Sequence, residues 1–354
     1  MKILKYLFFL FLIVIIAGAI YVATQDGEYH IEETTVLDAP VSVIFNEVNN
    51  LENWESWGPW RSATDDEVIE FKKTTRGEGA GFEWKSEELG DGSITTTNVL
   101  PENSIEQQVV HNPTFAESQG RMYWKFEEVE EGTRVTLGLE GSQSFKEKLA
   151  FAFRDNSITD IIKPRLAAGL QKLDSTVQNR MSQYTVNVDG LTTHGGGFYM
   201  YSTTASKISQ IPVNMQIMIT EVKNYMEANN ISQLGDPFVV YNKLDEQNDS
   251  AIYSVGIFTP SLVITPQDSN ILNAMMPVQK VVKATLKGDY ENLEEAWDST
   301  YTYLENNNLR PDQERQPFEV FRTDPETTPN PAEWVTEIYI PIVTEAATTS
   351  EIEI

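Results

Sequence analysis

The sequence predicts an α+β protein in which two different antiparallel sheet domains follow one apolar helix. Three observations support this prediction: an uncharged apolar stretch near the N-terminus, a middle segment of short strands that ends in a long helix, and a later segment in which a strand–helix–strand–strand pattern occurs twice. The length of 354 residues suits about two domains. The predicted boundaries are 1–25 for a transmembrane anchor, 29–183 and 184–344 for the two domains, and 345–354 for an acidic tail.

The N-terminal stretch from Tyr6 to Ala23 contains no charged residue, and about 20 helical residues cross a bilayer core. Lys2 and Lys5 precede it and acidic residues follow it, which predicts a cytoplasmic N-terminus and an extracytoplasmic body, on the periplasmic face of a bacterial inner membrane. A cleaved secretory signal is the alternative, with a cleavage site among the small residues 17–19. The apolar run continues through Val22, which favours an uncleaved single-pass anchor.

Composition excludes several classes of function. The chain has 53 acidic and 26 basic residues, a net charge of −27, and so large an acidic excess would repel nucleic acid. Cysteine is absent, which excludes disulfides, thiol catalysis and zinc–thiolate sites. The three histidines, His30, His111 and His194, lie far apart in the sequence, so we expect neither a metal centre nor a cofactor.

The first domain begins with an alternating segment, 30–37, that predicts a strand. Asp38-Ala39-Pro40 then predicts the start of a helix, with the Asp38 carboxylate as its cap. Short strand-like runs separated by glycine-rich turns follow, which is typical of a curved antiparallel sheet. The domain ends in a predicted helix that includes residues 158–181 and contains Pro164, which should kink this helix or mark its first turn.

Several short motifs in this domain occur in an order that is typical of one family. They are Ala39-Pro40-Val41, Trp54 with Trp57-Gly58-Pro59-Trp60, Gly77-x-Gly79-x-Gly81-x-x-Trp84, and Gly132-Thr133-x-Val135-x-Leu137-x-x-x-Gly141. In these residues the segment resembles the polyketide cyclase/dehydrase branch of the START-like (SRPBCC) superfamily. The resemblance implies a helix-grip fold, in which the sheet wraps around the long helix and encloses an apolar ligand cavity. It says little about chemistry.

The second domain contains an internal repeat. Residues 225–231 match residues 303–309 at four identical positions, and two further positions exchange one aliphatic residue for another. Each match ends a helical stripe of apolar and aromatic residues with the same spacing. The stripes are Met215, Met218, Ile219, Val222, Tyr225 and Met226 in the first copy, and Leu293, Ala296, Trp297, Thr300, Tyr303 and Leu304 in the second.

Downstream of the stripes, Pro237–Tyr241 aligns with Pro317–Phe321, and Ile252-Tyr253 aligns with Ile338-Tyr339 on the closing strands. One strand–helix–strand–strand unit could hardly bury its helix alone. We therefore expect the two halves to lie side by side and share one sheet.

The second copy also carries a family resemblance. Its motifs are Lys287-Gly288-Asp289-Tyr290-x-x-Leu293-x-x-Ala296-Trp297, Pro317-Phe318-Glu319-Val320-Phe321-x-x-Asp324-Pro325, and Thr336-Glu337-Ile338-Tyr339-Ile340-Pro341-Ile342. They resemble the GyrI-like, or AraC-type effector-binding, family. The resemblance implies a cleft between the two halves that accepts organic, often cationic, molecules and is lined by aromatic residues and a glutamate. Glu319 stands at the acidic position of the family motif, and Phe321 replaces a more usual tyrosine.

The repeat gives a separate reason to examine Glu319, because its partner in the first copy is the apolar Val239. Burying an unpaired carboxylate costs several kcal/mol, so a fold does not place one in such a position for stability. The alternative is that Glu319 lies on the outer face of its strand and is solvated. The predicted ligand-binding residues are Glu319, Phe321, Trp297, Tyr339 and Glu337. For the aromatic members, a place in the core is the competing interpretation.

The sequence favours a binding protein over an enzyme, because no nucleophile–base–acid motif is present and no catalytic residue can be named. The leading prediction is a membrane-anchored, extracytoplasmic protein with apolar and aromatic cavities for hydrophobic or cationic small molecules, and with no nucleic-acid partner. One alternative is a GyrI-like hydrolase of reactive small molecules that uses Glu319 as a base. Another is an acidic protein-interaction module.

Overall fold

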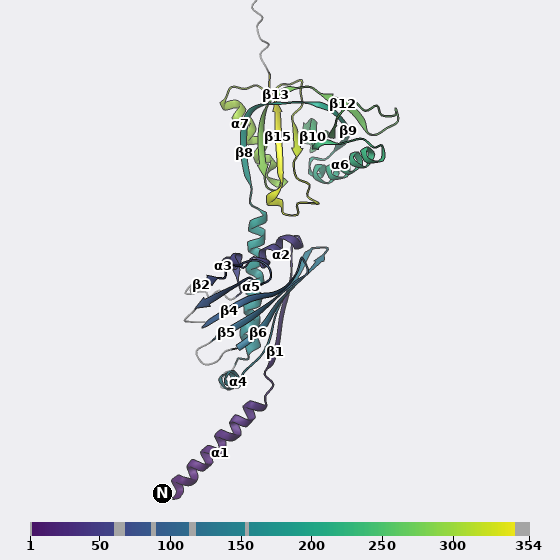
Figure 1. The fold of residues 1–354 in the computed structure, drawn as a ribbon. Helices are drawn as coiled ribbons and strands as arrows, with labels where there is room; N and C mark the ends of the chain where they lie inside the picture. The colour runs from purple at the N-terminus through teal and green to yellow at the C-terminus, as the bar shows by residue number, and fades with distance from the viewer. Residues whose placement is uncertain (1, 60–67, 86–89, 113–117, 153–155, 344–354) are drawn as a thin grey trace, which may run out of the picture. The chain divides into compact units, whose positions relative to one another are not determined.

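The computed structural model describes residues 2–59, 68–85, 90–112, 118–152 and 156–343 (Figure 1). The chain forms two compact units, Met1–Arg180 and Met181–Ile354, which we call unit 1 and unit 2. Each unit contains helices and one antiparallel sheet. This confirms the prediction of an α+β chain with two antiparallel sheets.

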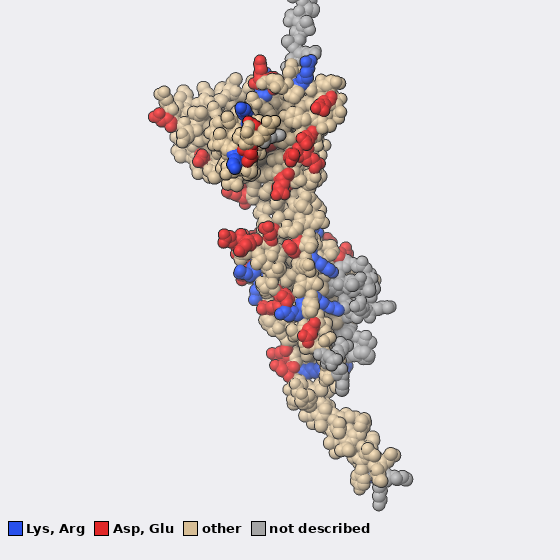
Figure 2. Space-filling model, turned by 180° about the vertical axis from the view of Figure 1, so that it is seen from behind, with Lys and Arg blue, Asp and Glu red and all other residues tan. Residues whose placement is uncertain are grey.

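The N-terminal helix α1 (Lys2–Thr24) includes a segment, Ile3–Thr24, that is long and apolar enough to cross a membrane. Its described side chains are exposed apart from Val22, which is buried, and Ala19, which is half-buried. On the face shown in Figure 2, α1 carries no charged side chain along most of its length. A secretory signal near the N-terminus would meet the same criteria of length and apolar character.

Unit 1 is built on a seven-stranded sheet with the order β1-β7-β6-β5-β4-β3-β2. Its strands are β1 (Glu28–Leu37), β2 (Val68–Phe71), β3 (Gly81–Lys85), β4 (Asp91–Leu100), β5 (Ser104–Asn112), β6 (Ser118–Val129) and β7 (Gly132–Ser142). Alternation along β6 gives the sheet two faces: Met122, Trp124 and Phe126 are buried on the inner face, and Arg121 and Lys125 are exposed on the outer face.

The helices of unit 1 are α2 (Val41–Asn49), α3 (Trp54–Trp57), α4 (Phe145–Phe151) and α5 (Ile158–Met181), with a short 3-10 turn η1 (Leu51–Asn53). In α5, Leu166, Leu170, Leu173 and Val177 form a buried stripe at helical spacing. Pro164 lies inside α5, where its missing N–H removes one helical hydrogen bond.

The predicted cap of α2 is wrong. The helix begins at Val41, and the preceding cap position is Pro40, which has an extended backbone and offers no side-chain hydrogen bond. Asp38 therefore stands two residues before the cap position, too early for its carboxylate to accept from the free N–H groups of the first turn.

The inner face of unit 1 holds a tryptophan cluster. The rings of Trp54, Trp57 and Trp124 lie 5.1–5.9 Å apart, and all three side chains are buried. Trp60, which the sequence places near this cluster, lies outside the described residues.

Glu47 is a buried carboxylate, 3% exposed, that joins three helices of unit 1. It accepts hydrogen bonds from the Trp57 Nε1–H at 2.9 Å and from the Asn53 amide at 3.0 Å. Arg180, near the end of α5, approaches the same carboxylate to 2.7 Å. Polar and charged groups thus satisfy Glu47 within the core.

Unit 2 is built on an eight-stranded sheet with the order β12-β9-β11-β10-β14-β15-β13-β8. Its strands are β8 (Thr185–His194), β9 (Gly197–Ser206), β10 (Leu234–Asp245), β11 (Ser250–Thr259), β12 (Leu272–Met276), β13 (Gln279–Lys287), β14 (Phe318–Phe321) and β15 (Val335–Pro341). Its helices are α6 (Ile211–Ala228) and α7 (Leu293–Asn306), and its 3-10 turns are η2 (Ile208–Gln210), η3 (Glu246–Asn248), η4 (Tyr290–Asn292) and η5 (Pro331–Glu333).

The two halves of unit 2 meet at the centre of this sheet, where β10 pairs with β14. On each side of that seam the order is the same: β10, β11, β9 in the first half and β14, β15, β13 in the second. Both helices also end alike, because Asn230 and Asn308 adopt a left-handed backbone that terminates the helix. This arrangement is consistent with the predicted duplication and places both halves in one sheet.

One part of the predicted repeat alignment is wrong. Val239 pairs with Val255 on β11, and Glu319 pairs with Ile338 on β15, so the register equates Val255 with Ile338. The sequence alignment had instead matched Ile252 with Ile338, three residues earlier. A shift by an odd number of residues moves a strand's side chains to the opposite face, and Ile252 is indeed exposed whereas Ile338 is buried.

The sheet of unit 2 curls so that its two ends approach each other. Strands β8 and β9 lie near opposite ends of the sheet order, yet only Gly195 and Gly196 separate them in the chain. His194, at the end of β8, lies 5.8 Å from the ring of Phe258 on β11 and 4.9 Å from that of Phe318 on β14. The inner side of the curl is thus filled by aromatic rings.

We expect Glu47→Ala to lower the free energy of unfolding of unit 1 by about 1–3 kcal/mol, because it leaves the buried Trp57 N–H without an acceptor. Glu47→Gln should cost less, since its amide oxygen can still accept that bond. Urea unfolding of the full chain, followed by hydrogen exchange in α2 and α3, measures both. Glu52→Ala is the control and should have a small effect, because Glu52 lies exposed on η1. Equal losses for the two Glu47 variants would contradict this account.

Candidate functional site

The candidate site lies at the seam of unit 2, around Glu319 on β14. Glu319 is 1% exposed, so the alternative of a solvated outer-face carboxylate does not hold. The Trp297 indole on α7 donates a hydrogen bond to Oε1 at 2.6 Å, and the Tyr241 hydroxyl on β10 donates one to Oε2 at 3.0 Å. The carboxylate is therefore held by one donor from each half of the repeat.

Both helices cover the face of the sheet on which Glu319 lies. Val239 is the direct cross-strand partner of Glu319, and cross-strand partners point to the same face. Val239 packs in one cluster with Met215 and Ile219 of α6, whereas Glu319 bonds to Trp297 of α7. The carboxylate thus lies beneath both helices, and we call this side of the sheet the helix face.

Burial dominates the electrostatics of the site. It raises the pKa of Glu319 to about 7, although the hydrogen bonds from Trp297 and Tyr241 act in the opposite direction. Burial also raises the pKa of Tyr241 well above its ordinary value, and the neighbouring Glu319 raises it further. Among the described residues, no lysine or arginine forms an ion pair with Glu319.

The repeat shows how this polar group replaces an apolar one. In the first half, the equivalent positions hold Ile219 in place of Trp297 and Val239 in place of Glu319, and these two residues belong to one apolar cluster. In the second half the same positions hold an indole N–H and a carboxylate at hydrogen-bond distance. Between the two halves, the hydrogen-bond acceptor and its donor are therefore introduced together.

Aromatic side chains extend from the carboxylate toward the surface. The Trp297 ring lies 6.1 Å from that of Tyr301 in a stacked arrangement, and Tyr301 is 41% exposed. The Tyr241 ring meets Trp297 edge-on at 6.0 Å. On the other side, Phe321 meets Tyr290 edge-on at 5.5 Å. These rings supply flat apolar surfaces next to a buried negative charge.

The five predicted ligand-binding residues do not form one group. Glu319, Trp297 and Phe321 belong to the helix face, as their contacts with the clusters under α6 and α7 show. Glu337 and Tyr339 alternate with Ile338 along β15 and therefore point to the opposite face, inside the curl. Strand alternation therefore groups Glu319, Trp297 and Phe321 on one face and separates Glu337 and Tyr339 from them.

Glu337 differs from Glu319 in having cationic partners. Lys283 approaches it to 2.7 Å and Arg322 to 2.5 Å. Burial acts to raise the pKa of Glu337, but hydrogen bonds from Lys283, Tyr339 and Arg322 outweigh it and lower the pKa. Tyr339 stacks on Phe318 at 4.9 Å and donates a hydrogen bond to Glu337 at 2.7 Å. This group is an internally satisfied ion-pair cluster.

Sequence reasoning did not name Tyr241 and Tyr290 as members of the site. For Tyr241, a signal was present, because the repeat aligns it with Phe321, the position where a tyrosine is usual in the GyrI-like motif. The hydroxyl that Phe321 lacks is supplied by Tyr241 from the other half. Only the pairing of β10 with β14 brings it to Glu319, and that pairing is not visible in the periodicity.

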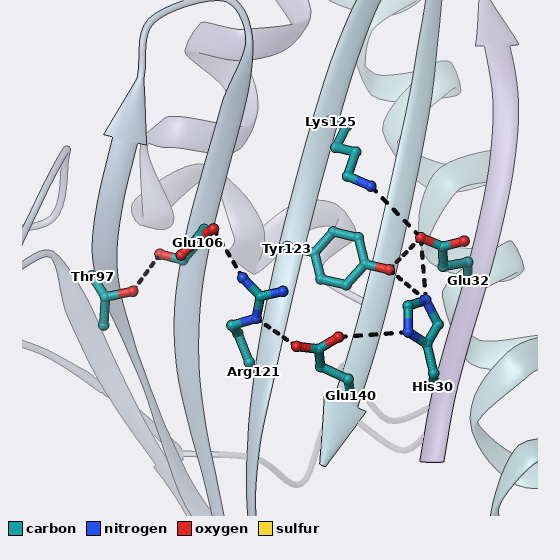
Figure 3. A network of polar contacts seen from close by, with 8 residues as sticks. All are labelled: His30, Glu32, Thr97, Glu106, Arg121, Tyr123, Lys125 and Glu140. Carbon is teal, nitrogen blue, oxygen red and sulfur yellow. Dashed lines mark hydrogen bonds and ion pairs between the residues drawn. The ribbon is translucent and has the colours of Figure 1, made fainter. Parts of the chain in front are cut away.

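Unit 1 contains a second polar group, a network on the outer face of its sheet (Figure 3). Its members are His30, Glu32, Thr97, Glu106, Arg121, Tyr123, Lys125 and Glu140. Arg121 pairs with Glu140 at 2.7 Å and with Glu106 at 2.9 Å, and the network adjoins an open hollow of about 810 Å³. Its ion pairs join neighbouring strands on the exposed face of the sheet.

No group of three or more metal-ligating side chains occurs among the described residues. On the inner face of unit 1, the buried Trp84 Nε1–H has no hydrogen-bond acceptor among the residues that the structure describes. Asn49 Oδ1 and Asn50 Oδ1 are two further buried polar atoms of unit 1 without a partner among the described residues.

The buried carboxylate should make stability depend on pH. The folded chain keeps the Glu319 proton up to about pH 7, whereas the unfolded chain loses it near pH 4.5. The contribution of Glu319 to the free energy of unfolding is therefore greatest below pH 4.5 and is lost as the pH rises to 7. Relative to Glu319→Gln, which cannot ionise, we expect the wild type to lose about 3 kcal/mol between pH 4.5 and 8. Urea unfolding at several pH values, with hydrogen exchange in β14 and β15 as the readout, measures this difference. A difference that does not change with pH would show that Glu319 has an ordinary pKa.

Residues 199–343 match the family described as GyrI-like, a small molecule binding domain. A search of curated proteins found no match. Among solved structures, the EcmrR C-terminal domain is 16% identical, with a TM-score of 0.39, and the match covers 46% of this chain and 99% of that one. The cryo-EM structure of an EcmrR–DNA complex is 16% identical, with a TM-score of 0.40, and the match covers 57% of this chain and 78% of that one.

Protein CV1439 from Chromobacterium violaceum is 13% identical, with a TM-score of 0.32, and its match covers 42% of this chain and 96% of that one. The GyrI-like match at residues 199–343 lies within unit 2.

Proposed function

We propose that unit 2 binds a small organic cation and that Glu319 is the counter-charge for that cation. The observation that carries this proposal is a fully buried carboxylate that has two hydrogen-bond donors but no ion-paired lysine or arginine among the described residues. The GyrI-like match supports small-molecule binding by this unit, and the site chemistry suggests the class of ligand.

A cation would remove the energetic penalty at Glu319. An ionised carboxylate in a medium of low dielectric is costly, and an opposite charge nearby compensates that cost. Trp297 and Tyr241 would add cation–π attraction of roughly 0.5–2 kcal/mol. The cationic side chain of Lys223 on α6 cannot serve instead, because it pairs with Asp324 at 3.0 Å.

For unit 1, we propose a START-like helix-grip domain with an apolar ligand cavity. The sheet order, the stripe of α5 on the inner face and the aromatic lining support this assignment. The Trp84 N–H would give such a ligand one hydrogen-bond donor. The domain limits that we propose are 29–183 for unit 1 and 184–344 for unit 2, with an anchor at 1–25 and a tail at 345–354.

We propose that α1 is an uncleaved membrane anchor and that the remainder is extracytoplasmic. The exposed apolar surface of α1 and the two lysines at its start support this orientation. The net charge of −27 supports a chain that does not bind nucleic acid.

A second candidate function follows from the pKa of Glu319. A carboxylate with a pKa of about 7 is suited to accept a proton near neutral pH, as a hydrolase of reactive small molecules would require. Turnover of an epoxide or activated ester by the wild type, lost in Glu319→Gln, would support this function. Saturable binding without turnover would leave cation binding as the function of the site.

The proposed function predicts that cation affinity rises with pH. Only the ionised form of Glu319 attracts a cation, so the apparent affinity should fall about 100-fold between pH 8 and pH 5 as the carboxylate takes up its proton. Calorimetry with tetraphenylphosphonium and the full chain in nonionic detergent measures this change. Glu319→Gln should bind weakly at both pH values.

Two controls make this test specific. Tetraphenylborate has the same shape and the opposite charge, and it should not gain affinity as the pH rises. Glu305→Gln removes one charge from an exposed position on α7 and should leave cation binding unchanged. If Glu305→Gln weakened binding as much as Glu319→Gln, the effect would come from overall charge and the proposal would fail.

A further inference from the structure

Helix α4 of unit 1 has an unusual surface for so short a helix. None of its side chains is buried, and Phe145 and Leu149 are 45% and 39% exposed. Two large apolar side chains therefore face solvent one helical turn apart. Nothing in the fold of unit 1 requires them, since they fill no space in its core.

The residues of α4 are arranged in an amphipathic pattern. At 3.6 residues per turn, Phe145, Leu149 and Ala152 lie on one side of the helix, with Lys146 and Lys148 on its two flanks. Glu147 lies on the opposite side and forms a capping box with Ser144 at the start of the helix. The apolar stripe is thus bordered by lysines on both sides, and the only carboxylate points away from it.

Helix α4 is held beside the end of α1. Lys148 Nζ donates a hydrogen bond to the carbonyl oxygen of Gln25 at 2.6 Å, and Gln143 N–H donates one to the carbonyl oxygen of Gly27 at 2.8 Å. Gln25 directly follows Thr24, the last residue of α1. Figure 1 accordingly shows α4 next to the segment that leads from α1 into β1. The two exposed apolar side chains therefore lie at the end of the candidate membrane span.

We propose that α4 docks on the surface of the bilayer that α1 crosses. Phe145 and Leu149 enter the boundary between headgroups and acyl chains, and Lys146 and Lys148 lie toward the phosphates of anionic lipids. This inference rests on the proposed anchoring by α1. The lysines matter because the chain as a whole is strongly acidic, and an anionic membrane would otherwise repel it. Docking fixes unit 1 to the membrane at a second point beyond the anchor.

The absence of cysteine from the sequence permits a clean test. Leu149→Cys in the full chain is labelled with the fluorophore NBD and reconstituted in vesicles of phosphatidylcholine and phosphatidylglycerol. The matched control is Val36→Cys, because Val36 is 44% exposed and lies near the other end of β1, about 26 Å from Glu28. We expect the label at 149 to shift to the blue and to be quenched at least twofold by doxyl-labelled lipids, and the label at 36 to stay in water.

The same samples separate this inference from the anchoring on which it rests. Resistance of the protein to carbonate extraction reports insertion of α1. If the chain is inserted but the label at 149 stays in water, docking is wrong while the anchor stands. If the chain is extracted, the anchor fails and docking with it. Protection of the label from iodide without quenching by doxyl lipids would show that a protein surface covers α4, which also overturns the proposal.

Charge is tested separately with Lys146→Glu in the labelled chain. We expect the blue shift at 149 to shrink in vesicles with phosphatidylglycerol and to change little in phosphatidylcholine alone. Equal shifts in both lipids, before and after the substitution, would overturn the part assigned to the lysines.

Discussion

The Glu319 carboxylate at the seam of unit 2 is the constraint to which much of that unit is adjusted. The sheet is continuous only because β10 pairs with β14, and this pairing encloses Glu319 opposite Val239. A carboxylate enclosed there needs donors, and it receives one from each half, Trp297 from the second and Tyr241 from the first. The two halves therefore depend on each other chemically as well as through the sheet, since neither half alone can satisfy the group.

Strand alternation divides the chemistry of unit 2 between two faces. Glu319 and Glu337 lie on adjacent strands, yet the first points beneath the helices and the second points into the curl. On the helix face, burial outweighs two neutral hydrogen-bond donors and raises the pKa of Glu319. In the curl, Lys283 and Arg322 help to lower the pKa of Glu337. The charge of Glu337 is thus compensated by side chains of the fold itself. Glu319 has no cationic partner among the described residues, and burial instead raises its pKa to about 7.

The sequence predicted the features that arise from local periodicity and missed those set by register. The helical stripes and the sharing of one sheet by the two halves follow from spacing within the repeat. The match of Ile252 with Ile338 failed because only the register fixes the length of each connection: Val255 lies 16 positions after Val239, whereas Ile338 lies 19 positions after Glu319. The hydrogen bond from Tyr241 to Glu319 could not be predicted, because it depends on which strands are neighbours. The hydrophobic periodicity within each half does not show which strands pair between the halves.

A pKa near neutrality also explains how unit 2 can hold such a group without a ligand. While Glu319 is protonated it is a neutral carboxylic acid, and the penalty for burying a charge is absent. Above pH 7 the charge appears, and the free energy that it costs becomes available to any cation that reaches it. Binding of a cation below that pH must therefore expel a proton. Under the proposed function, the cation takes the place of the proton, and the ionised carboxylate is then paired with the bound cation.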